Sequence, residues 1–426
     1  MFSNTKKVAA ITATTGLLLA GFAGVAPAQA ATPTLLVWAD ETRGPHLQSL
    51  FGSLDSQTVG QYVPGYKIEV VAEANFDALK TAVDAATPQN GPDVIFGPND
   101  WVSTGVKNGK LAPVTLSSSV KKQYTANALA DLSYQGKLYG VPLDVNNVVM
   151  IRNTKLAAAA PKTFGEMVDL YKAKKASKKL TAGLCIAGGG MSFGGYSVLN
   201  ALGGGAYKMK ANGTVDTKAN PTDVNAFTAN VKKYLLDASG KSNGFFPATD
   251  QGCKDNFLAG KVPYAVIGNW EWSGYEDAGF SMSTVQPVPG VKAGTYGAAF
   301  GSVSGALLTS FAETRGNTSG AKALLGYFAS KLGAKKYELL EKRPPANSTV
   351  TGLLPGQTAF AHAAQLASVP QIGPILGGGY NGSKSYWDTS GALWTAILVD
   401  KKNVKTEATQ FNGIMKVNAV EGAKLL

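Results

Sequence analysis

The feature that most constrains the fold is a regular alternation of apolar, strand-like segments with helix-like segments near the start of the chain. Strands are predicted at 35–39, 67–72 and 92–96, because each segment is short and apolar and ends at polar or glycine-rich residues. A helix is predicted after the first strand, at 45–54, and another after Asn75, which can cap it. This order predicts an α/β fold with a parallel sheet that helices cover on both faces.

Polar side chains follow each of these three strands. In open sheets of this kind, ligands bind beyond the carboxyl ends of the strands. The loops after the strands are therefore candidates for a binding edge. The candidate residues in these loops are Glu41, Arg43, Glu73, Asn75, Asp100 and Trp101.

A second candidate site lies in the aromatic segment 264–275. Its first four residues are apolar and predict a short buried strand, which Gly268-Asn269 ends. Trp270, Trp272 and Tyr275 follow. Such rings can bind a flat ligand or close a core; we favour binding for Trp270 and packing for the other two.

The length of 426 residues exceeds what one hydrophobic core usually holds, so two domains are expected. Further along, the sequence predicts a hairpin at 134–140, a strand at 148–151 and a strand at 301–309. Thr163 followed by Glu166 matches a capping box and predicts the start of a helix.

The first thirty residues have the pattern of a secretory signal peptide. Lys6-Lys7 precede an apolar stretch, and Ala28-Gln29-Ala30 fits a cleavage site, so we predict a signal peptide at 1–30 and a mature start near Ala31. No later segment has the roughly 18 apolar residues of a spanning helix. We therefore expect an exported protein of the cell envelope, periplasm or extracellular space that does not span the membrane.

The signal region also bears on lipid anchoring. Leu18-Leu19-Ala20-Gly21 resembles the start of a lipoprotein signal, but Phe22 stands where the lipidated cysteine would be. No lipid anchor is expected at this position.

Charge and cysteine usage exclude several classes of function. The net charge is +12, but the lysines are scattered in pairs along the chain, which is typical of solvated helix faces and not of a nucleic-acid site. Cys185 and Cys253 in an exported chain favour one disulfide, and two buried thiols are the alternative. With only two histidines beside them, no metal site and no cofactor are expected.

One catalytic motif is present by sequence. Gly190-Met191-Ser192-Phe193-Gly194 matches the nucleophile elbow of a serine hydrolase, and His362 is its candidate base. Short matches of this kind arise easily in a glycine-rich chain, and the segment around His362 is predicted to be helical. A secreted hydrolase, of the serine type or a glycosidase with two facing carboxylates, therefore stays the alternative function.

Aromatic residues near predicted loops favour carbohydrate binding over catalysis. Sugar rings stack their C–H faces on aromatic planes, and their hydroxyls need carboxylates, amides or arginine. Carboxylates such as Asp144 can accept these hydroxyl hydrogen bonds as well as perform catalysis. The aromatic candidates include Trp101, Phe193, Tyr196, Trp270 and Trp387.

Several short segments, in order along the chain, resemble the extracellular sugar-binding proteins of ABC importers, of the maltose/maltodextrin-binding type. The resemblance covers most of the chain from about Leu35 to Thr395. It is carried by the segments 36–38, 91–96, 108–113, 136–142, 151–153, 161–166, 257–261 and 268–273.

The resemblance implies a two-lobe fold of the periplasmic-binding-protein type II, with a mostly parallel sheet in each lobe and a ligand cleft between the lobes. The implied lobes are 32–145 plus 300–345 and 146–299 plus 346–426. Trp270 matches the family's main stacking tryptophan, and Asp100 matches a carboxylate that binds sugar hydroxyls. The other implied ligand contacts are Arg43, Phe193, Tyr196 and Trp387.

Two positions depart from the family pattern and concern the identity of the sugar. Asn146 stands where the maltodextrin binders have Glu, and Gly97 stands where they have Trp. The expected function is the carbohydrate-binding component of an ABC importer, a monomer that binds a di- or oligosaccharide by hinge closure and delivers it to the transmembrane subunits of the permease. A structural protein that adheres to the cell envelope is a third alternative.

Overall fold

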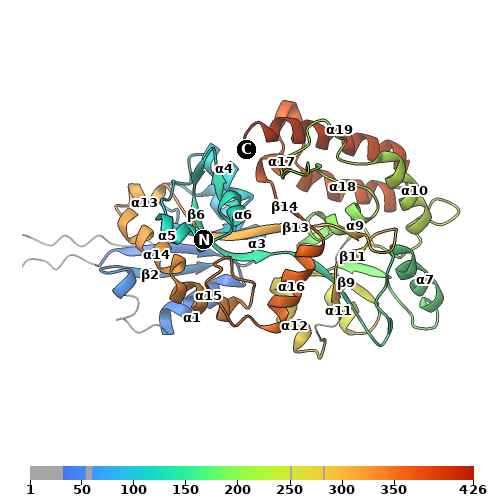
Figure 1. The fold of residues 1–426 in the computed structure, drawn as a ribbon, viewed down its shortest axis with the longest axis horizontal. Helices are drawn as coiled ribbons and strands as arrows, with labels where there is room; N and C mark the ends of the chain where they lie inside the picture. Colours follow the sequence, from blue (N-terminus) through green and yellow to red (C-terminus); the bar gives the residue numbers. More distant parts are fainter. Residues whose placement is uncertain (1–31, 54–59, 250–251, 282–283) are drawn as a thin grey trace, which may run out of the picture. The chain divides into compact units, whose positions relative to one another are not determined.

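The computed structural model describes residues 32–53, 60–249, 252–281 and 284–426. The predicted signal peptide at 1–30 and the last residue of the first predicted helix, Leu54, lie outside the described residues. Figure 1 shows the fold and labels many of its helices and strands.

The first sheet is built on the three parallel strands that the alternation predicts. β1 (Thr34–Ala39) pairs in parallel with β2 (Lys67–Ala72) and β3 (Val94–Pro98). β13 (Ala299–Leu308) pairs antiparallel with β3 and with β6 (Gly140–Asn146). β14 (Ser368–Pro370) pairs in parallel with the start of β13, which gives the order β14-β13-β3-β1-β2 with β6 also on β13.

The second sheet has the order β10-β7-β9-β8. Its strands are β7 (Val148–Arg152), β8 (Leu184–Ile186), β9 (Tyr264–Gly268) and β10 (Val285–Gln286). β7 is antiparallel to β9 and β10, and only β8 and β9 are parallel. This corrects the expectation that each sheet is mostly parallel: β7 continues almost directly from β6 and so enters this sheet without a helical crossover.

Two small hairpin-like sheets complete the strands. β4 (Ser133–Tyr134) and β5 (Lys137–Leu138) are antiparallel, and β11 (Val288–Pro289) pairs with β12 (Tyr296–Gly297). Gln135 and Gly136 between β4 and β5 both have positive φ, 49° and 74°, as in the turns that favour short hairpins. The predicted hairpin is therefore present.

Helices cover both sheets. Those that pack on the first core are α1 (Arg43–Ser53), α3 (Phe76–Ala85), α4 (Trp101–Lys107), α5 (Ser118–Lys121), α6 (Ala126–Asp131), α13 (Phe311–Thr314), α14 (Thr318–Ala329) and α15 (Lys331–Glu341). Those of the remaining chain are α7 (Phe164–Lys174), α8 (Gly190–Phe193), α9 (Tyr196–Ala201), α10 (Val224–Tyr234), α11 (Cys253–Leu258), η1 (Asn269–Glu271), α12 (Trp272–Glu276), α16 (Pro355–Leu366), α17 (Gly373–Gly377), η3 (Tyr380–Gly382), α18 (Tyr386–Leu398) and α19 (Val404–Ala423). No helix of the described residues is long and apolar enough to cross a membrane.

The buried apolar side chains divide the chain into two lobes. One core draws on residues from Leu35 to Leu143 and from Val303 to Ala346. The remaining buried clusters draw on residues from Val148 onward, on Phe300 and on the C-terminal helices. The two-lobe α/β fold is thus as predicted, whereas the boundaries 32–145 plus 300–345 and 146–299 plus 346–426 stay a prediction.

The lobes are connected where β6 passes into β7 and along β13. Asn147, between β6 and β7, donates through Nδ2 to the Phe360 carbonyl of α16 at 3.1 Å. Asn269, just after β9, donates through Nδ2 to the Val145 carbonyl of β6 at 2.8 Å. Amide side chains therefore tie the crossing segment to both α16 and the loop after β9.

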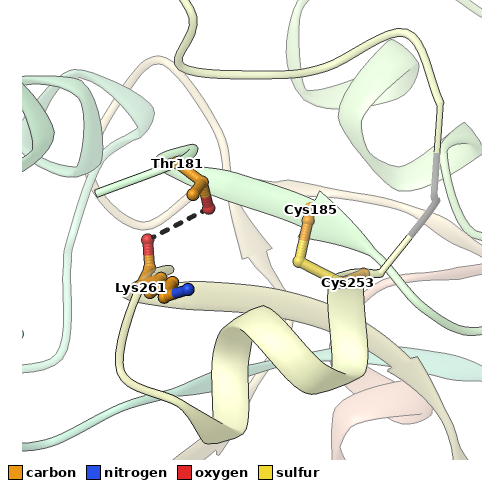
Figure 2. The surroundings of a disulfide bond; sticks show 4 residues. All are labelled: Thr181, Cys185, Cys253 and Lys261. Atoms are coloured by element: carbon orange, nitrogen blue, oxygen red, sulfur yellow. Dashed lines mark hydrogen bonds between the residues drawn. A yellow bond between two sulfur atoms is a disulfide. The ribbon is translucent and has the colours of Figure 1, made fainter. Parts of the chain in front are cut away.

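A disulfide joins Cys185 of β8 to Cys253 at the start of α11 (Figure 2). Both residues are buried, and their Cα atoms are 5.6 Å apart. Next to them, Thr181 Oγ1 donates to the Lys261 carbonyl at 3.4 Å (Figure 2). The pairing agrees with the disulfide expected from the sequence and links β8 to α11 across 68 residues of chain.

Candidate functional site

The loops after β1, β2 and β3 lie at one edge of the first sheet, because the three strands are parallel neighbours. Glu41 after β1 is exposed, and Glu73 after β2 is partly exposed. Asn75 accepts a hydrogen bond from the Ala78 amide at 2.8 Å and so caps α3, as predicted. The ligand-binding roles of Glu41, Glu73 and Asn75 stay predictions.

Arg43 is buried at this edge in a network of protein groups. Its guanidinium donates to Asp40 Oδ2 at 2.6 Å, to Ser304 Oγ at 2.6 Å and to Tyr337 OH at 3.1 Å. Its Nη2 also lies 3.5 Å from Asp144 Oδ2. Burial opposes ionisation of Asp40, but the Arg43 charge, hydrogen bonds from the Arg43 amide and Thr42, and the Arg343 charge together hold the pKa of Asp40 well below its usual range. Arg43 therefore joins the loop after β1 to β6, β13 and α15 at this sheet edge. Its contact with a ligand stays a prediction.

Asp144 and Asn146 lie on β6, opposite Ser304 and Ser302 of β13. Asn146 donates through Nδ2 to Ser304 Oγ at 2.7 Å, and Asp144 Oδ2 accepts from Tyr337 OH at 3.1 Å. Asp144 Oδ1 and Asn146 Oδ1 are buried and have no donor among the described residues. Each of these predicted site residues therefore keeps one acceptor atom free for a ligand or water.

Asn99 and Asp100 occupy the loop after β3, where the first lobe contacts the second. Asn99 donates through Nδ2 to the Gln371 carbonyl at 2.8 Å. A Cβ on Gly373, the first residue of α17, would lie 3.1 Å from Asp100 Cα, so the two segments pack backbone to backbone. Burial raises the pKa of Asp100 to about 6, against the opposing charge of Lys80.

Six buried side-chain oxygens in these segments have no donor among the described residues. An acceptor buried without a donor costs about 1–3 kcal/mol, so a ligand or water that brings a donor would stabilise this region. All six are amide or carboxylate acceptors, and sugar hydroxyls are donors. They belong to Asn99, Asp100, Asp144, Asn146, Asn269 and Gln371.

An aromatic cluster on the second lobe complements these acceptors. The Phe193 and Trp270 ring centroids are 6.0 Å apart, and Phe300 lies 6.0 Å from Phe193 and 5.9 Å from Trp387. Phe193, Trp270 and Trp387 are partly exposed, whereas Phe300 is buried beneath them. The structure therefore brings three of the predicted aromatic residues together.

Tyr196 is a core residue, which corrects its prediction as a ligand contact. Only 1% of its surface is exposed, and its ring stacks on Phe300 at 3.9 Å and 16°. Burial also raises the pKa of its hydroxyl to about 12. The sequence places Tyr196 after a glycine-rich segment, but it begins α9 and points into the core.

Trp272 and Tyr275 are buried, in agreement with their expected packing role.

Phe300 and β13 are the parts of the site that sequence reasoning missed. Side chains at alternate positions of a strand share a face, so Phe300, Ser302 and Ser304 of β13 lie on one side. The strand therefore carries the base of the aromatic cluster and the hydroxyls beside Asp144 and Asn146. The sequence predicts a strand at 301–309, and the alternation of Ser302 and Ser304 within it could have pointed to this face. Phe300 lies one residue before the predicted start.

The described residues contain no Ser–His arrangement that would support the serine-hydrolase alternative. Ser192 lies inside α8 and donates its hydroxyl to the Trp387 carbonyl at 2.9 Å. His362 is exposed on α16, and His46 Nδ1 lies 3.0 Å from Glu341 Oε1 of α15. Neither histidine is the hydrogen-bond partner of Ser192, as a general base would be.

Comparison with protein families gives a match to the bacterial extracellular solute-binding proteins over residues 58–365. The chain belongs to this family. The match includes β2, β3, β6, β9 and β13, and it leaves out β1, Arg43, Gln371 and Trp387.

Curated relatives of this solute-binding protein are distant. It is 24% identical to the galactooligosaccharide-binding protein of Bacillus subtilis over 74% of this chain and 73% of that protein. It is 25% identical to the maltotriose-binding protein of Pyrococcus abyssi over 53% of this chain and 48% of the relative. It is 29% identical to a maltooligosaccharide ABC transporter solute-binding lipoprotein of Streptococcus pneumoniae over 48% of this chain and 49% of the relative. The alignment thus spans only about half the length of the last two relatives.

Among solved structures, the maltotriose-binding protein of Thermus thermophilus bound with maltotriose is similar in fold. The TM-score is 0.67 at 20% sequence identity, with 90% of this chain and 99% of that chain covered. This likeness shows the two-lobe fold of this solute-binding protein.

Proposed function

We propose that this solute-binding protein is the extracellular carbohydrate-binding component of an ABC sugar importer. The observation that carries the proposal is the meeting, along β13, of a partly exposed aromatic cluster with buried acceptors that have no donor among the described residues. A sugar ring offers a C–H face to Trp270 and hydroxyl donors to acceptors such as Asp100 and Asn146. The names of the relatives, which refer to malto- and galactooligosaccharides, support this ligand class.

The mechanism is hinge closure without chemistry on the ligand. Asn99, Asp100 and Asp144 belong to the first lobe, whereas the other three acceptors and the aromatic cluster belong to the second. A bound di- or oligosaccharide therefore makes its full set of contacts only when the lobes are closed. Binding therefore shifts the population toward the closed state. The transmembrane subunits of the permease recognise that state, and the protein acts as an exported monomer without catalytic activity and without a lipid at Phe22.

Calorimetric titration with malto- and galactooligosaccharides tests the proposal. Trp270→Ala is expected to weaken sugar binding by about 1–3 kcal/mol, because it removes the partly exposed ring of the cluster. Tyr296→Ala is the matched control, since Tyr296 on β12 is an aromatic residue with 39% of its surface exposed.

Two results would contradict the proposal. Unchanged sugar affinity in Trp270→Ala would remove the aromatic cluster from the site. Turnover of a glycan or ester by the wild-type protein would instead favour the hydrolase.

A further inference from the structure

Phe76 is an exposed aromatic residue at the sheet edge that faces the candidate site. It is the first residue of α3, four positions after the end of β2, and 41% of its surface is exposed. Leu79 and Val83 share its helical face and are buried. Phe76 therefore lies at the N-terminal end of the core-facing stripe of α3, beside the loop that follows β2.

Trp101 holds the Phe76 ring in place from the neighbouring loop. The two ring centroids are 5.2 Å apart with 41° between the planes. A Cβ on Gly97 would lie 2.9 Å from Trp101 Cε3, so the indole packs directly on the glycine backbone. Lys80 Nζ lies 5.8 Å from the indole centroid. Trp101 is buried by these contacts, and Phe76 presents the exposed face of the pair.

The pair of Phe76 and Trp101 lies next to the place where the first lobe contacts the second. Asp100, the residue before Trp101, packs its backbone against Gly373 of α17. Asp100 also has a buried Oδ1 without a donor among the described residues. The pair therefore adjoins an acceptor of the site and lies on the opposite lobe from the cluster around Trp270.

We infer that Phe76, held by Trp101, is a second sugar-stacking position that makes the site selective for oligosaccharides over single sugars. The inference rests on the proposed function. A monosaccharide ring stacks on one aromatic surface at a time, whereas a longer chain reaches from the Trp270 cluster on one lobe to Phe76 on the other. Gly97 provides the space for this arrangement, because any side chain there would displace the Trp101 indole.

The test is the dependence of affinity on ligand length. Malto- and galactooligosaccharides from one to four units are titrated by calorimetry into the wild-type protein and into Phe76→Ala. The wild-type affinity is expected to rise with length, and Phe76→Ala is expected to lose about tenfold on the longer ligands, which is about 1.4 kcal/mol, and to leave the monosaccharide unaffected. Phe76→Tyr retains a stacking ring and is expected to restore the rise.

Two further variants separate stacking from general damage. Tyr296→Ala removes an equally exposed aromatic side chain of the second lobe and is expected to change nothing at any length. Gly97→Ala is expected to reproduce the length-selective loss by displacing Trp101, with folding checked by thermal melting.

Each other outcome overturns the inference. An equal loss on all ligands, or no loss on any, would show that Phe76 does not sense ligand length. Absence of sugar binding by the wild-type protein would overturn the proposed function as well, and so is distinguishable from failure of the Phe76 position alone.

Discussion

At the scale of single residues, Arg43 is the cation on which a buried cluster of charges depends. Arg43→Met would leave Asp40 and Asp144 buried without their shared cation. Removal of one partner from a buried ion pair typically costs about 3–5 kcal/mol, so a loss of that size is expected in the free energy of unfolding at pH 7, measured with urea. The exposed pair of Lys424 with Glu421, at 2.7 Å, is the control, and Lys424→Met is expected to cost less than about 1 kcal/mol. Equal costs for the two variants would contradict this assignment.

Asp100 gives a second residue-scale prediction, on pH. Burial raises its pKa from 3.8 to about 6 in the folded protein, so between these values the folded state holds a proton that the unfolded state has lost. Stability should therefore fall as pH rises through this window, by up to about 3 kcal/mol. Asp100→Asn removes this cost. It is expected to be more stable than wild type at pH 8 and little changed at pH 4, as measured by urea unfolding, and an equal difference at both pH values would rule the explanation out.

Residue roles were the least predictable part of the chain. The sequence predicts Arg43 at a binding edge, but its donors are taken by Ser304 and Tyr337, which lie 261 and 294 positions away. Tyr196 follows a glycine-rich segment, and only the packing of α9 shows that its ring faces the core. Phe76 falls on the apolar stripe of its helix, so the periodic pattern marks it as a core residue although it is exposed.

At the scale of elements, a substitution just after the C-terminal end of α15 is expected to stabilise the protein. Lys342 follows the helix with φ 54° and ψ 27°, a left-handed conformation that costs most residues about 1–2 kcal/mol and suits glycine. Lys342→Gly is expected to raise the free energy of unfolding by about 0.5–1 kcal/mol, because the relief of strain exceeds glycine's entropy cost. Lys336→Gly, in the exposed interior of the same helix, is the control and is expected to lower it by about 1 kcal/mol. A loss of stability in both variants would contradict the prediction.

Elements were more predictable than residues because their signals are local. β2 has the predicted bounds, and Asn75 and Thr163 cap their helices through hydrogen bonds to residues three positions later. The direction of β7 was not predictable, because it depends on how the chain crosses from one sheet to the other. α17 (Gly373–Gly377) was not predictable either, because its short length gives no periodic signal in the sequence.

At the scale of the whole molecule, the disulfide constrains the unfolded chain. It closes a loop of 68 residues, for which chain entropy gives about 4 kcal/mol of stabilisation. The double variant Cys185→Ser, Cys253→Ser is therefore expected to melt about 5 °C lower than wild type. A reducing agent should lower the melting temperature of wild type only, and an effect on the double variant would point to another cause.

The two-lobe architecture was predictable because many weak segments agree in order along the chain. Each of them occurs in unrelated proteins, but the alternation of strands and helices and the family-like segments favour the same fold. How the lobes share β13 was not predictable, since strand pairing between residues some two hundred positions apart leaves no local pattern.

Because β13 takes part in both lobes, the order in which the chain is synthesised limits when each lobe can fold. β3 pairs with β13 through contacts such as Val94 with Leu308, so the first lobe keeps an open sheet edge until the ribosome has passed the second sheet. The second core needs α18 and α19, at the end of the chain. The first core can therefore close only after β13 and the segment up to Ala346 have been made, and the second core closes only when the C-terminal helices are present.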